Sequence, residues 1–185
     1  MQRADVLYSI CPGTPDDARA IAALHADSWR TAYRGLLPDS FLDGPVIDER
    51  LRYWIARMPA PDAPRRRLFK AVSDRTIIGF ACVALDAEPQ WGALVDNLHV
   101  QPDVKRQGIG TRLFAEARAW VADAAPGVPM HLTVIEKNVN ARRFYDRLGG
   151  RIVERKTVEV IPGTPLAILR YLWEAQVRTS ANLTR

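Results

Sequence analysis

The most informative stretch of the sequence spans residues 95–113 and reads VDNLHVQPDVKRQGIGTRL. Its start is apolar and strand-like, its middle is a basic turn, and we expect a helix to begin at its two glycines. Free N–H groups and the positive end of the helix dipole make a helix N-terminus a ready site for phosphate. Gly108 and Gly110 let a phosphate approach the backbone, while Lys105 and Arg106 add positive charge. The stretch therefore predicts a phosphate-binding turn between a strand and a helix.

Two better-known phosphate loops do not fit this turn. No Gly-Lys-Ser/Thr follows the glycines, so the turn is not a Walker A loop. The first glycine of the dinucleotide fingerprint Gly-x-Gly-x-x-Gly has no counterpart either. Thr111 adds a hydroxyl donor, yet a Gly-x-Gly pair after a strand is also compatible with a purely structural turn.

A second stretch supports the phosphate interpretation. Residues 138–150 read NVNARRFYDRLGG and follow an apolar run that is typical of a strand. Asn138 is expected where that strand ends. Tyr145 follows seven residues later, about two helical turns away and on nearly the same side of the helix. The order strand, turn, helix thus occurs twice in succession.

Together the two stretches resemble the Gcn5-related N-acetyltransferases, the GNAT superfamily. The phosphate motif of that family is Arg/Gln-x-x-Gly-x-Gly/Ala after a strand that ends Leu-x-Val-x-Pro. Its second motif is Asn-x-x-Ala-x-x-Phe-Tyr-x-x-x-Gly-Phe. The resemblance covers roughly residues 68–173 and includes the order of the elements. Lys105 replaces the usual Arg or Gln, and Gly150 replaces the usual aromatic residue, which we expect to loosen the packing after the helix.

The periodicity of the chain predicts an α+β domain with three layers, α/β/α, around a mixed sheet. By resemblance the sheet has about seven strands, is mostly antiparallel, and is splayed between strands 4 and 5 in the GNAT fold. Strand-like runs cover residues 6–10, 68–72, 76–85, 91–100, 130–135, 152–160 and 166–173. Helical patterns cover residues 15–33, 36–42, 46–58, 108–122 and 138–148.

We expect a single N-acetyltransferase domain over residues 1–175. Residues 15–58 would form a helical substrate flap, and residues 176–185 a disordered tail. Trp29 and Tyr33 are four residues apart in the flap and therefore share a helix face. They are candidate substrate-binding residues, although such a stripe is also typical of a core.

The resemblance implies acetyl-CoA as the acetyl donor, bound in the opening between strands 4 and 5, and no metal. The backbone at the end of strand 4 would pair with the pantetheine arm and the thioester carbonyl, and the basic turn would wrap the pyrophosphate. Asn138 would hydrogen-bond the pantetheine, and Tyr145 would lie beside the sulfur. The cofactor-binding residues expected on this basis are Leu98, His99, Val100, Lys105, Arg106, Gln107, Gly108, Ile109, Gly110, Thr111, Asn138 and Tyr145.

Tyr145 is the candidate general acid, because a phenol can donate a proton to the sulfur as it leaves. The alternative is that Tyr145 is an aromatic residue packed between its helix and the sheet. A backbone N–H near Val100 could stabilise the charge that develops on the thioester oxygen.

The general base is less well defined by the sequence. The family often has a carboxylate six residues before the Val100 position, but here that residue is Leu94. Asp96 lies two residues further along the strand and is the first candidate. Glu136, which we also regard as a candidate substrate-binding residue, and His99 are the others. Each has a structural alternative, and deprotonation through ordered water is a further possibility. His25 and His131 have no metal-ligand spacing, so no metal site is expected.

Charge is unevenly distributed along the 185 residues. Residues 1–96 hold 12 basic and 13 acidic side chains, a net charge of −1, and residues 97–185 hold 14 basic and 8 acidic, a net charge of +6. The basic half begins just before the predicted phosphate turn, which makes an anionic cofactor the natural partner. Nucleic-acid binding would require aromatic residues interleaved with the bases on an exposed surface. The bases instead cluster in the glycine turn and in residues 138–151, so we expect no nucleic acid as a partner.

Other features indicate a cytoplasmic protein. No apolar run approaches the roughly 18 residues of a membrane span, and the first residues lack the apolar stretch of a signal peptide, so we expect no membrane partner. Cys11 and Cys82 form no CxxC pair, which fits a reducing cytoplasm and gives no support to a disulfide framework.

Three functions stay open on the sequence alone. The first is direct transfer of an acetyl group to a primary amine in a ternary complex, because neither motif holds a cysteine for a covalent acetyl-enzyme. The second is N-terminal acetylation of peptides or ribosomal proteins. The third is a regulatory module that binds acetyl-CoA without turnover. The resemblance also allows a homodimer, on which the sequence gives no information.

Overall fold

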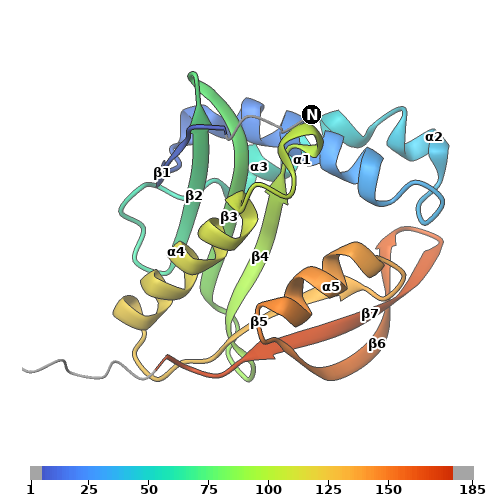
Figure 1. The fold of residues 1–185 in the computed structure, drawn as a ribbon. Helices are drawn as coiled ribbons and strands as arrows, with labels where there is room; N and C mark the ends of the chain where they lie inside the picture. The colour runs from blue at the N-terminus through green and yellow to red at the C-terminus, as the bar shows by residue number, and fades with distance from the viewer. Residues whose placement is uncertain (1–5, 177–185) are drawn as a thin grey trace, which may run out of the picture.

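Seven strands form one mixed sheet in the order β1-β2-β3-β4-β5-β7-β6 (Figure 1). The computed structural model describes residues 6–176. All neighbouring strands are antiparallel except β4 and β5, which are parallel. The strands are β1 Ser9–Pro12, β2 Arg66–Ser73, β3 Thr76–Glu88, β4 Gly92–Val100, β5 Met130–Ile135, β6 Arg151–Ile161 and β7 Thr164–Trp173. The predicted fold class is confirmed.

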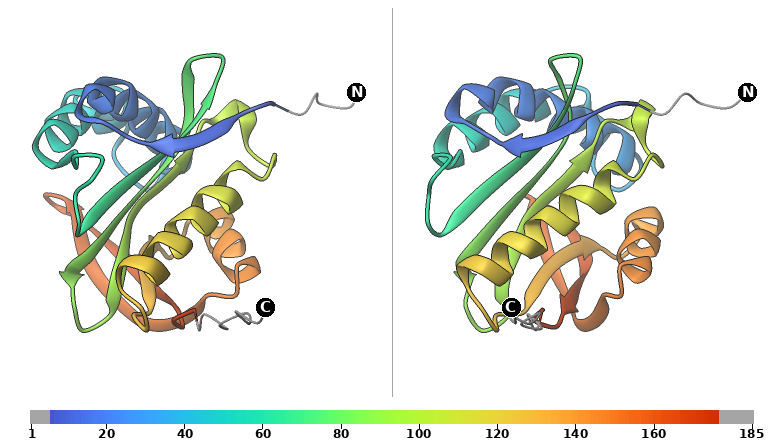
Figure 2. Two further views of the ribbon diagram at one scale, coloured as in Figure 1. Left: turned by 90° about the vertical axis from the view of Figure 1, so that its left-hand side faces the viewer. Right: turned by 60° about the vertical axis from the view of Figure 1, so that its left-hand side comes forward.

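Helices cover both faces of this sheet, so the domain has three layers (Figures 1 and 2). One layer consists of α1 and α3 with the short α2 beside them, and α4 lies on the opposite face. The helices are α1 Ala18–Ala32, α2 Asp39–Leu42, α3 Val46–Arg57, α4 Ile109–Ala124 and α5 Val139–Arg147, with 3-10 turns η1 Pro15–Asp17 and η2 Pro102–Val104.

The segment expected to be a flap is a packed layer of the domain. Its first turn begins with a capping box, in which the Thr14 backbone N–H donates to the Asp17 carboxylate at 2.7 Å. Ile21 on α1 and Trp54 on α3 are fully buried, and they pack against Phe80 of β3. Burial of such large apolar side chains contributes roughly 1.5–3 kcal/mol each. The segment is therefore a fixed wall. The expected tail falls outside the described residues, apart from position 176.

β4 is the strand that positions the site. Only Ala93 and Leu94 pair with β5, whereas β4 pairs with β3 along its length up to Val100. The edge of β4 that faces β5 is therefore unpaired from Val95 onward, and the two half-sheets diverge there (Figure 1). This is the splay that was predicted between the fourth and fifth strands.

A β-bulge at Asp96 decides which side chains face each helical layer. Val95 and Asn97 pair with consecutive residues of β3, so Asp96 is an extra residue without a partner. A bulge shifts the alternation of the side chains that follow it. Leu98 therefore packs on the core beneath α4, as Val95 does, and His99 faces α1.

Gly150 does not loosen the structure, so that expectation was wrong. A Cβ atom at this position would lie 2.6 Å from the Trp173 ring and 2.8 Å from the Tyr171 ring. The two rings pack directly against the Gly150 backbone, and only glycine fits beneath them.

Candidate functional site

The basic turn after β4 presents a row of free backbone donors. Arg106 and Gly108 have positive φ angles of 69° and 77°, and α4 begins directly after them. The backbone N–H groups from Arg106 to Thr111 donate to no backbone carbonyl within residues 6–176. Together with the helix dipole they form a concave anion site. This geometry matches the predicted phosphate-binding turn.

Side chains add to this turn in different ways. Gly110 lies against the opening, because a Cβ there would be 3.3 Å from the Phe144 ring and 3.6 Å from the Val100 side chain. The Gln107 side chain accepts from the Val6 backbone N–H at 3.0 Å, so it holds the N-terminal segment. Lys105 is half-buried, and burial lowers its pKa below the ordinary value. Arg106 and Thr111 are exposed.

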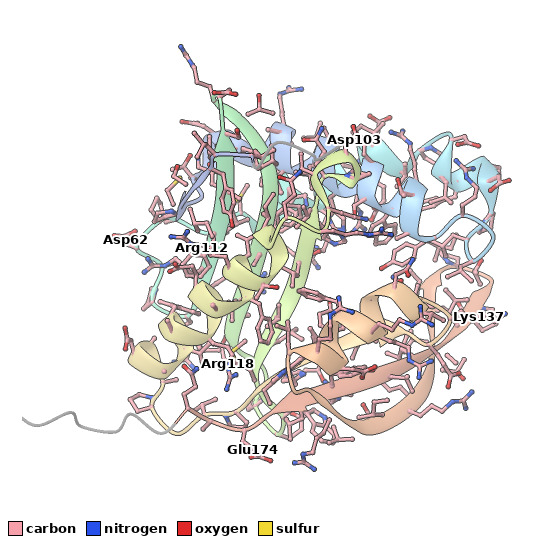
Figure 3. All side chains as sticks on the ribbon, in the orientation of Figure 1. Asp62, Asp103, Arg112, Arg118, Lys137 and Glu174 are labelled. Carbon is pink, nitrogen blue, oxygen red and sulfur yellow. The ribbon has the colours of Figure 1, made fainter. Side chains whose placement is uncertain are left out.

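The strand edge continues this row of unpaired groups. Leu98, His99 and Val100 lie in the part of β4 that has no partner on the β5 side. Unpaired strand edges bind extended chains by adding a strand. The edge could thus hold an extended, amide-containing ligand whose phosphate end reaches the turn. Figure 3 shows Asp103 in that turn and Lys137 at the start of α5.

Asn138 and Tyr145 come from α5. The Asn138 side-chain oxygen caps the helix, since it accepts from the Ala141 N–H at 3.2 Å, which leaves its amide NH2 group for a ligand. Tyr145 is 9% exposed and packs against the Tyr171 and Trp173 rings. The predicted packing role of Tyr145 is therefore real, and a chemical role is compatible with it.

The ionisation of Tyr145 is suppressed by its surroundings. Burial raises its pKa above the ordinary value, and the hydroxyls of Tyr33 and Tyr171 raise it further. Burial likewise raises the pKa of Tyr33 to about 12. Tyr145 is thus a protonated donor at any working pH, and Tyr33, the residue that follows α1, is close enough to affect this pKa.

His99 belongs to a buried network of neutral groups on the α1 side. Its Nδ1 lies 2.9 Å from the Ser28 hydroxyl, and its ring is 4.3 Å from that of His25. The Nδ1 of His25 accepts from the Trp54 indole at 3.0 Å. Burial, with the charges of Lys105 and Arg50, lowers the pKa of His99 to about 3. His99 is therefore a weak base and a wall residue.

Asp96 is held by two neighbours on the same face. The Tyr53 hydroxyl donates to its Oδ2 at 2.7 Å, and Arg66 lies 3.3 Å from the same oxygen. Asn97 donates to the Tyr53 hydroxyl at 3.3 Å. The Asp96 side chain is 25% exposed, and these neighbours do not contact its other carboxylate oxygen, Oδ1. An amine can approach that oxygen.

Glu136 has a different environment from Asp96. Its carboxylate forms a bidentate pair with Arg155 at 2.8 and 2.9 Å, and this pairing lowers its pKa. The pair lies at the end of β5 beside the solvent. This arrangement fits a structural role for Glu136, as the ion-pair partner of Arg155.

The aromatic residues of α1 meet α3 through a buried arginine. Trp29 and Tyr33 are neighbours at 5.3 Å, as their spacing predicted. The Arg50 guanidinium lies 4.2 Å from the Trp29 ring and 4.7 Å from the Tyr53 ring, with the side chain of Glu49 as its ion-pair partner. Such cation–π contacts stabilise by roughly 0.5–2 kcal/mol.

Sequence reasoning missed the contribution of α3 to the site. Arg50, Tyr53 and Arg57 have the spacing i, i+3, i+7, which puts them on one face of the helix. That pattern was visible in the sequence, but nothing in it showed that this face meets β4. Arg66 and Ser28 were also missed, because nothing in the sequence showed that they contact residues of β4.

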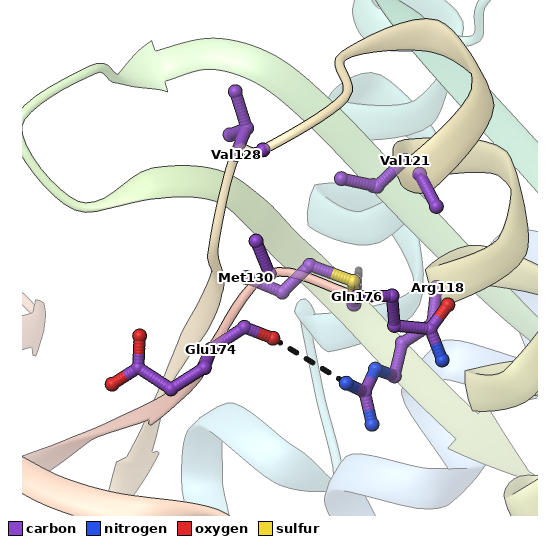
Figure 4. A pocket seen from close by; sticks show the side chains of 9 residues that line it. Arg118, Val121, Val128, Met130, Glu174 and Gln176 are labelled. Atoms are coloured by element: carbon purple, nitrogen blue, oxygen red, sulfur yellow. Dashed lines mark hydrogen bonds between the residues drawn. The ribbon is translucent and has the colours of Figure 1, made fainter. Parts of the chain in front are cut away.

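Two other features carry no site. Within residues 6–176 no group of His, Cys, Asp and Glu side chains could hold a metal ion. A small pocket between the end of α4 and the end of β7 is crossed by a bond from Arg118 to the Glu174 carbonyl at 3.4 Å (Figure 4). Its volume of about 10 Å³ has room for one water molecule at most.

No helix in the described part of the chain is long and apolar enough to cross a membrane.

Comparison with known proteins gives a family and relatives of similar sequence. A family model described as "Acetyltransferase (GNAT) family" matches residues 22–150. A probable N-acetyltransferase of Mycobacterium tuberculosis is 29% identical over 136 residues, which cover 72% of this chain and 74% of that protein. The peptidyl-lysine N-acetyltransferase YjaB of Salmonella typhimurium is 31% identical over 114 residues, 61% of this chain and 67% of that protein.

The fold is shared with solved structures as well. The PaiA N-acetyltransferase of Thermoplasma acidophilum, solved in complex with coenzyme A, superposes with a TM-score of 0.73 at 17% identity, over 90% of this chain and 99% of that one. The family model spans well over half of the present chain. The chain therefore belongs to the acetyltransferase (GNAT) family and is an N-acetyltransferase.

Proposed function

We propose that this protein transfers the acetyl group of acetyl-CoA to a primary amine by direct transfer in a ternary complex. The observation that carries the proposal is a set of unpaired backbone groups in two neighbouring stretches. One is the edge of β4 from Val95 to Val100, and the other is residues 106–111, where α4 begins. A ligand with an amide-containing arm and a pyrophosphate matches these two stretches.

The residues of the turn would hold the phosphates. The backbone N–H groups of Arg106, Gln107, Gly108, Ile109, Gly110 and Thr111 would donate to the pyrophosphate, with Lys105 supplying charge. Leu98, His99 and Val100 would pair with the pantetheine arm through their backbone, and Asn138 through its side-chain amide. Acetyl-CoA supplies the thioester when it is bound.

Tyr145 would donate the proton that the departing sulfur needs. Its raised pKa keeps the phenol protonated, and its ring is fixed by Tyr171 and Trp173. A fixed donor loses little entropy when the sulfur approaches. A backbone N–H near Val100 would stabilise the charge that develops on the carbonyl oxygen.

Asp96 would receive the amine on the other side of the opening. Its Oδ2 is occupied by Tyr53 and Arg66, and Oδ1 would accept from the incoming ammonium, directly or through water. One ammonium proton leaves along this path before the amine attacks, and the second proton, which the nitrogen loses from the tetrahedral intermediate, restores the Tyr145 phenol after it has protonated the sulfur. Glu136 is less suited, because Arg155 already satisfies both of its oxygens. Trp29 and Tyr33 would line the acceptor side near Tyr145.

Direct transfer fits the environment of the cysteines. Burial raises the pKa of the Cys82 thiol to about 12, so it is a poor nucleophile. Cys11 lies on β1, at the far edge of the sheet from β5. A covalent acetyl-enzyme therefore has no suitable cysteine.

Mass spectrometry of acetylation reactions tests this function. The purified protein and acetyl-CoA are offered a panel of small primary amines, a lysine-containing peptide and peptides with free N-termini. The proposal predicts a mass gain of one acetyl group on a small amine. Acetylation of the lysine peptide alone would favour the activity named for the Salmonella relative. Binding of acetyl-CoA without transfer to any acceptor would favour a regulatory module and contradict the proposal.

A further inference from the structure

The side chains around Tyr53 carry an excess of positive charge on the acceptor side of β4. Three guanidinium groups gather there. Arg50 lies 4.7 Å and Arg57 4.4 Å from the Tyr53 ring, while Arg66 contacts the carboxylate that the Tyr53 hydroxyl binds. Among the described residues 6–176, two carboxylates, Asp96 and Glu49, pair with them. Three positive and two negative groups leave an excess of one positive charge.

Arg57 is the cation without a partner in this group. Arg50 is buried and its fork is occupied by Glu49, and Arg66 is engaged with Asp96. No carboxylate forms an ion pair with Arg57 within residues 6–176, and its side chain is exposed. Its position is nevertheless fixed, because its guanidinium stacks on the Tyr53 ring. A fixed, exposed and unpaired guanidinium is well suited to binding a carboxylate or phosphate.

The unpaired cation lies a short distance from the carboxylate that would bind the amine. Arg57 stacks on the ring of Tyr53, and the hydroxyl of the same residue contacts Asp96. The phenol of Tyr53 therefore lies between the two charges and contacts both of them. Asp96 in turn belongs to the unpaired stretch of β4 where the thioester would lie. Opposite charges at this separation match a small molecule that carries an amine and an anionic group a few bonds apart.

We infer that the acceptor is a small amine with a nearby carboxylate or phosphate, bound by Asp96 through its ammonium and by Arg57 through its anionic group. The inference rests on the proposed function and adds the acceptor class to it. A polyamine or a lysine side chain in a basic peptide would place further positive charge beside the three arginines and would be disfavoured.

Matched pairs of amines test this acceptor class. One pair is 3-aminopropanoate with 1-aminopropane, and another is phosphoethanolamine with ethanolamine. We expect kcat/KM for the anionic member of at least one pair to be about tenfold higher than for its uncharged partner, as one charge-assisted hydrogen bond allows. The pair with the larger ratio tells whether carboxylate or phosphate is preferred.

Variants on α3 show whether Arg57 is responsible. Arg57→Gln should lower the preference for the anionic amine about tenfold, and Arg57→Lys should retain most of it. Arg52→Gln is the matched control, because Arg52 is an exposed arginine on the same helix outside this group. The control should leave both rates and their ratio unchanged.

Each outcome of this experiment decides a different point. Equal rates within both pairs, or the same preference in Arg57→Gln as in the unmodified protein, would overturn the inference while leaving the proposed function intact. Preference for the lysine peptide would overturn it in favour of a protein acceptor. Absence of transfer to every amine, with acetyl-CoA still bound, would refute the proposed function as well. The ratio in the unmodified protein is decisive even if Arg57→Gln folds poorly.

Discussion

The two sides of the proposed site differ in the chemical groups they present. The proposed cofactor side consists of backbone, namely the N–H groups of residues 106–111, which donate to no backbone carbonyl of the described chain, and the unpaired edge of β4. The proposed acceptor side consists of side chains that α3, β2 and β4 bring together around Tyr53. Backbone sites are sensitive to the shape of the chain and tolerate most changes of polar side chains. Side-chain sites respond to single charges, which allows acceptor choice to change while the cofactor site stays constant.

The largest expected effect concerns Tyr145, which would act where the two sides meet. Tyr145→Phe should lower kcat about 100-fold, because a positioned general acid contributes at least that much. The affinity for acetyl-CoA should stay nearly the same, since the ring and its packing are kept. Steady-state kinetics with a slow amine and a binding titration measure the two quantities.

Tyr171→Phe is the matched control for this variant. Its ring lies 5.7 Å from that of Tyr145, but its hydroxyl is bound to Asp146 at 2.8 Å and would not face the sulfur. We expect a much smaller loss of kcat. An unchanged kcat in Tyr145→Phe would assign that residue to packing alone.

The next effect tests the claim that the cofactor side depends on backbone shape. Gly110→Leu should weaken acetyl-CoA binding about 30-fold, the equivalent of one charge-assisted hydrogen bond. A Cβ at this position already approaches Phe144 and Val100, so a longer side chain would fill the space between α5 and β4. Calorimetric titration gives the affinity.

A side-chain change in the same turn serves as the comparison. Thr111→Ala removes one exposed hydroxyl and leaves the backbone intact, and we expect a loss of about fivefold at most. If Thr111→Ala weakened binding more than Gly110→Leu, the distinction between a backbone side and a side-chain side would fail.

A third effect concerns stability at low pH. Burial lowers the pKa of His99 to about 3, below the ordinary 6.5, so the unfolded chain binds the proton more readily. The contribution of neutral His99 to the free energy of unfolding is fully present above pH 6.5 and is lost as the pH falls toward 3. His99 should account for a loss of about 2 kcal/mol between pH 7 and pH 5. His25 and His131 have lowered pKa values as well and act in the same direction.

Chemical denaturation at the two pH values measures this loss. In His99→Asn the difference in unfolding free energy between pH 7 and pH 5 should shrink by about 2 kcal/mol. An equal difference in both proteins would mean that His99 titrates normally in the fold.

The smallest expected effect lies on the acceptor side. Asp96→Asn should lower kcat/KM for the amine about tenfold, because the ammonium loses one charged partner. The affinity for acetyl-CoA should not change. Asp86→Asn is a suitable control, since Asp86 is an exposed acidic residue of β3 that pairs with Arg65. If Asp96→Asn lowered the affinity for acetyl-CoA as much as Gly110→Leu is expected to, the place of Asp96 on the acceptor side would be contradicted.

The difference between the backbone side and the side-chain side also explains which parts of the site could be predicted from the sequence. The phosphate turn and α5 were predictable because their residues are contiguous and their spacing is fixed by strand–turn–helix geometry. The order of the elements along the chain followed from the periodicity, and the splay between strands 4 and 5 followed from the family resemblance. Tyr53 and Asp96 are 43 positions apart, and no local pattern indicates that they touch. Their contact depends on how α3 packs, which is a tertiary property.

Two further details required the structure. The bulge at Asp96 sets which side of β4 each following residue faces, and alternation in the sequence does not reveal it. The expected loosening at Gly150 was wrong because Tyr171 and Trp173, more than 20 residues away, fill that space. Packing partners of a small residue are distant in sequence, so its environment could not be predicted.

Hydrogen–deuterium exchange with and without acetyl-CoA tests the central claim most directly, because it reports on backbone N–H groups. The account predicts slower exchange on binding at residues 106–111, along the unpaired edge of β4 and at the start of α5. It predicts little change along α3, which belongs to the acceptor side. Protection centred on α3, or binding with no protection at residues 106–111, would contradict the account.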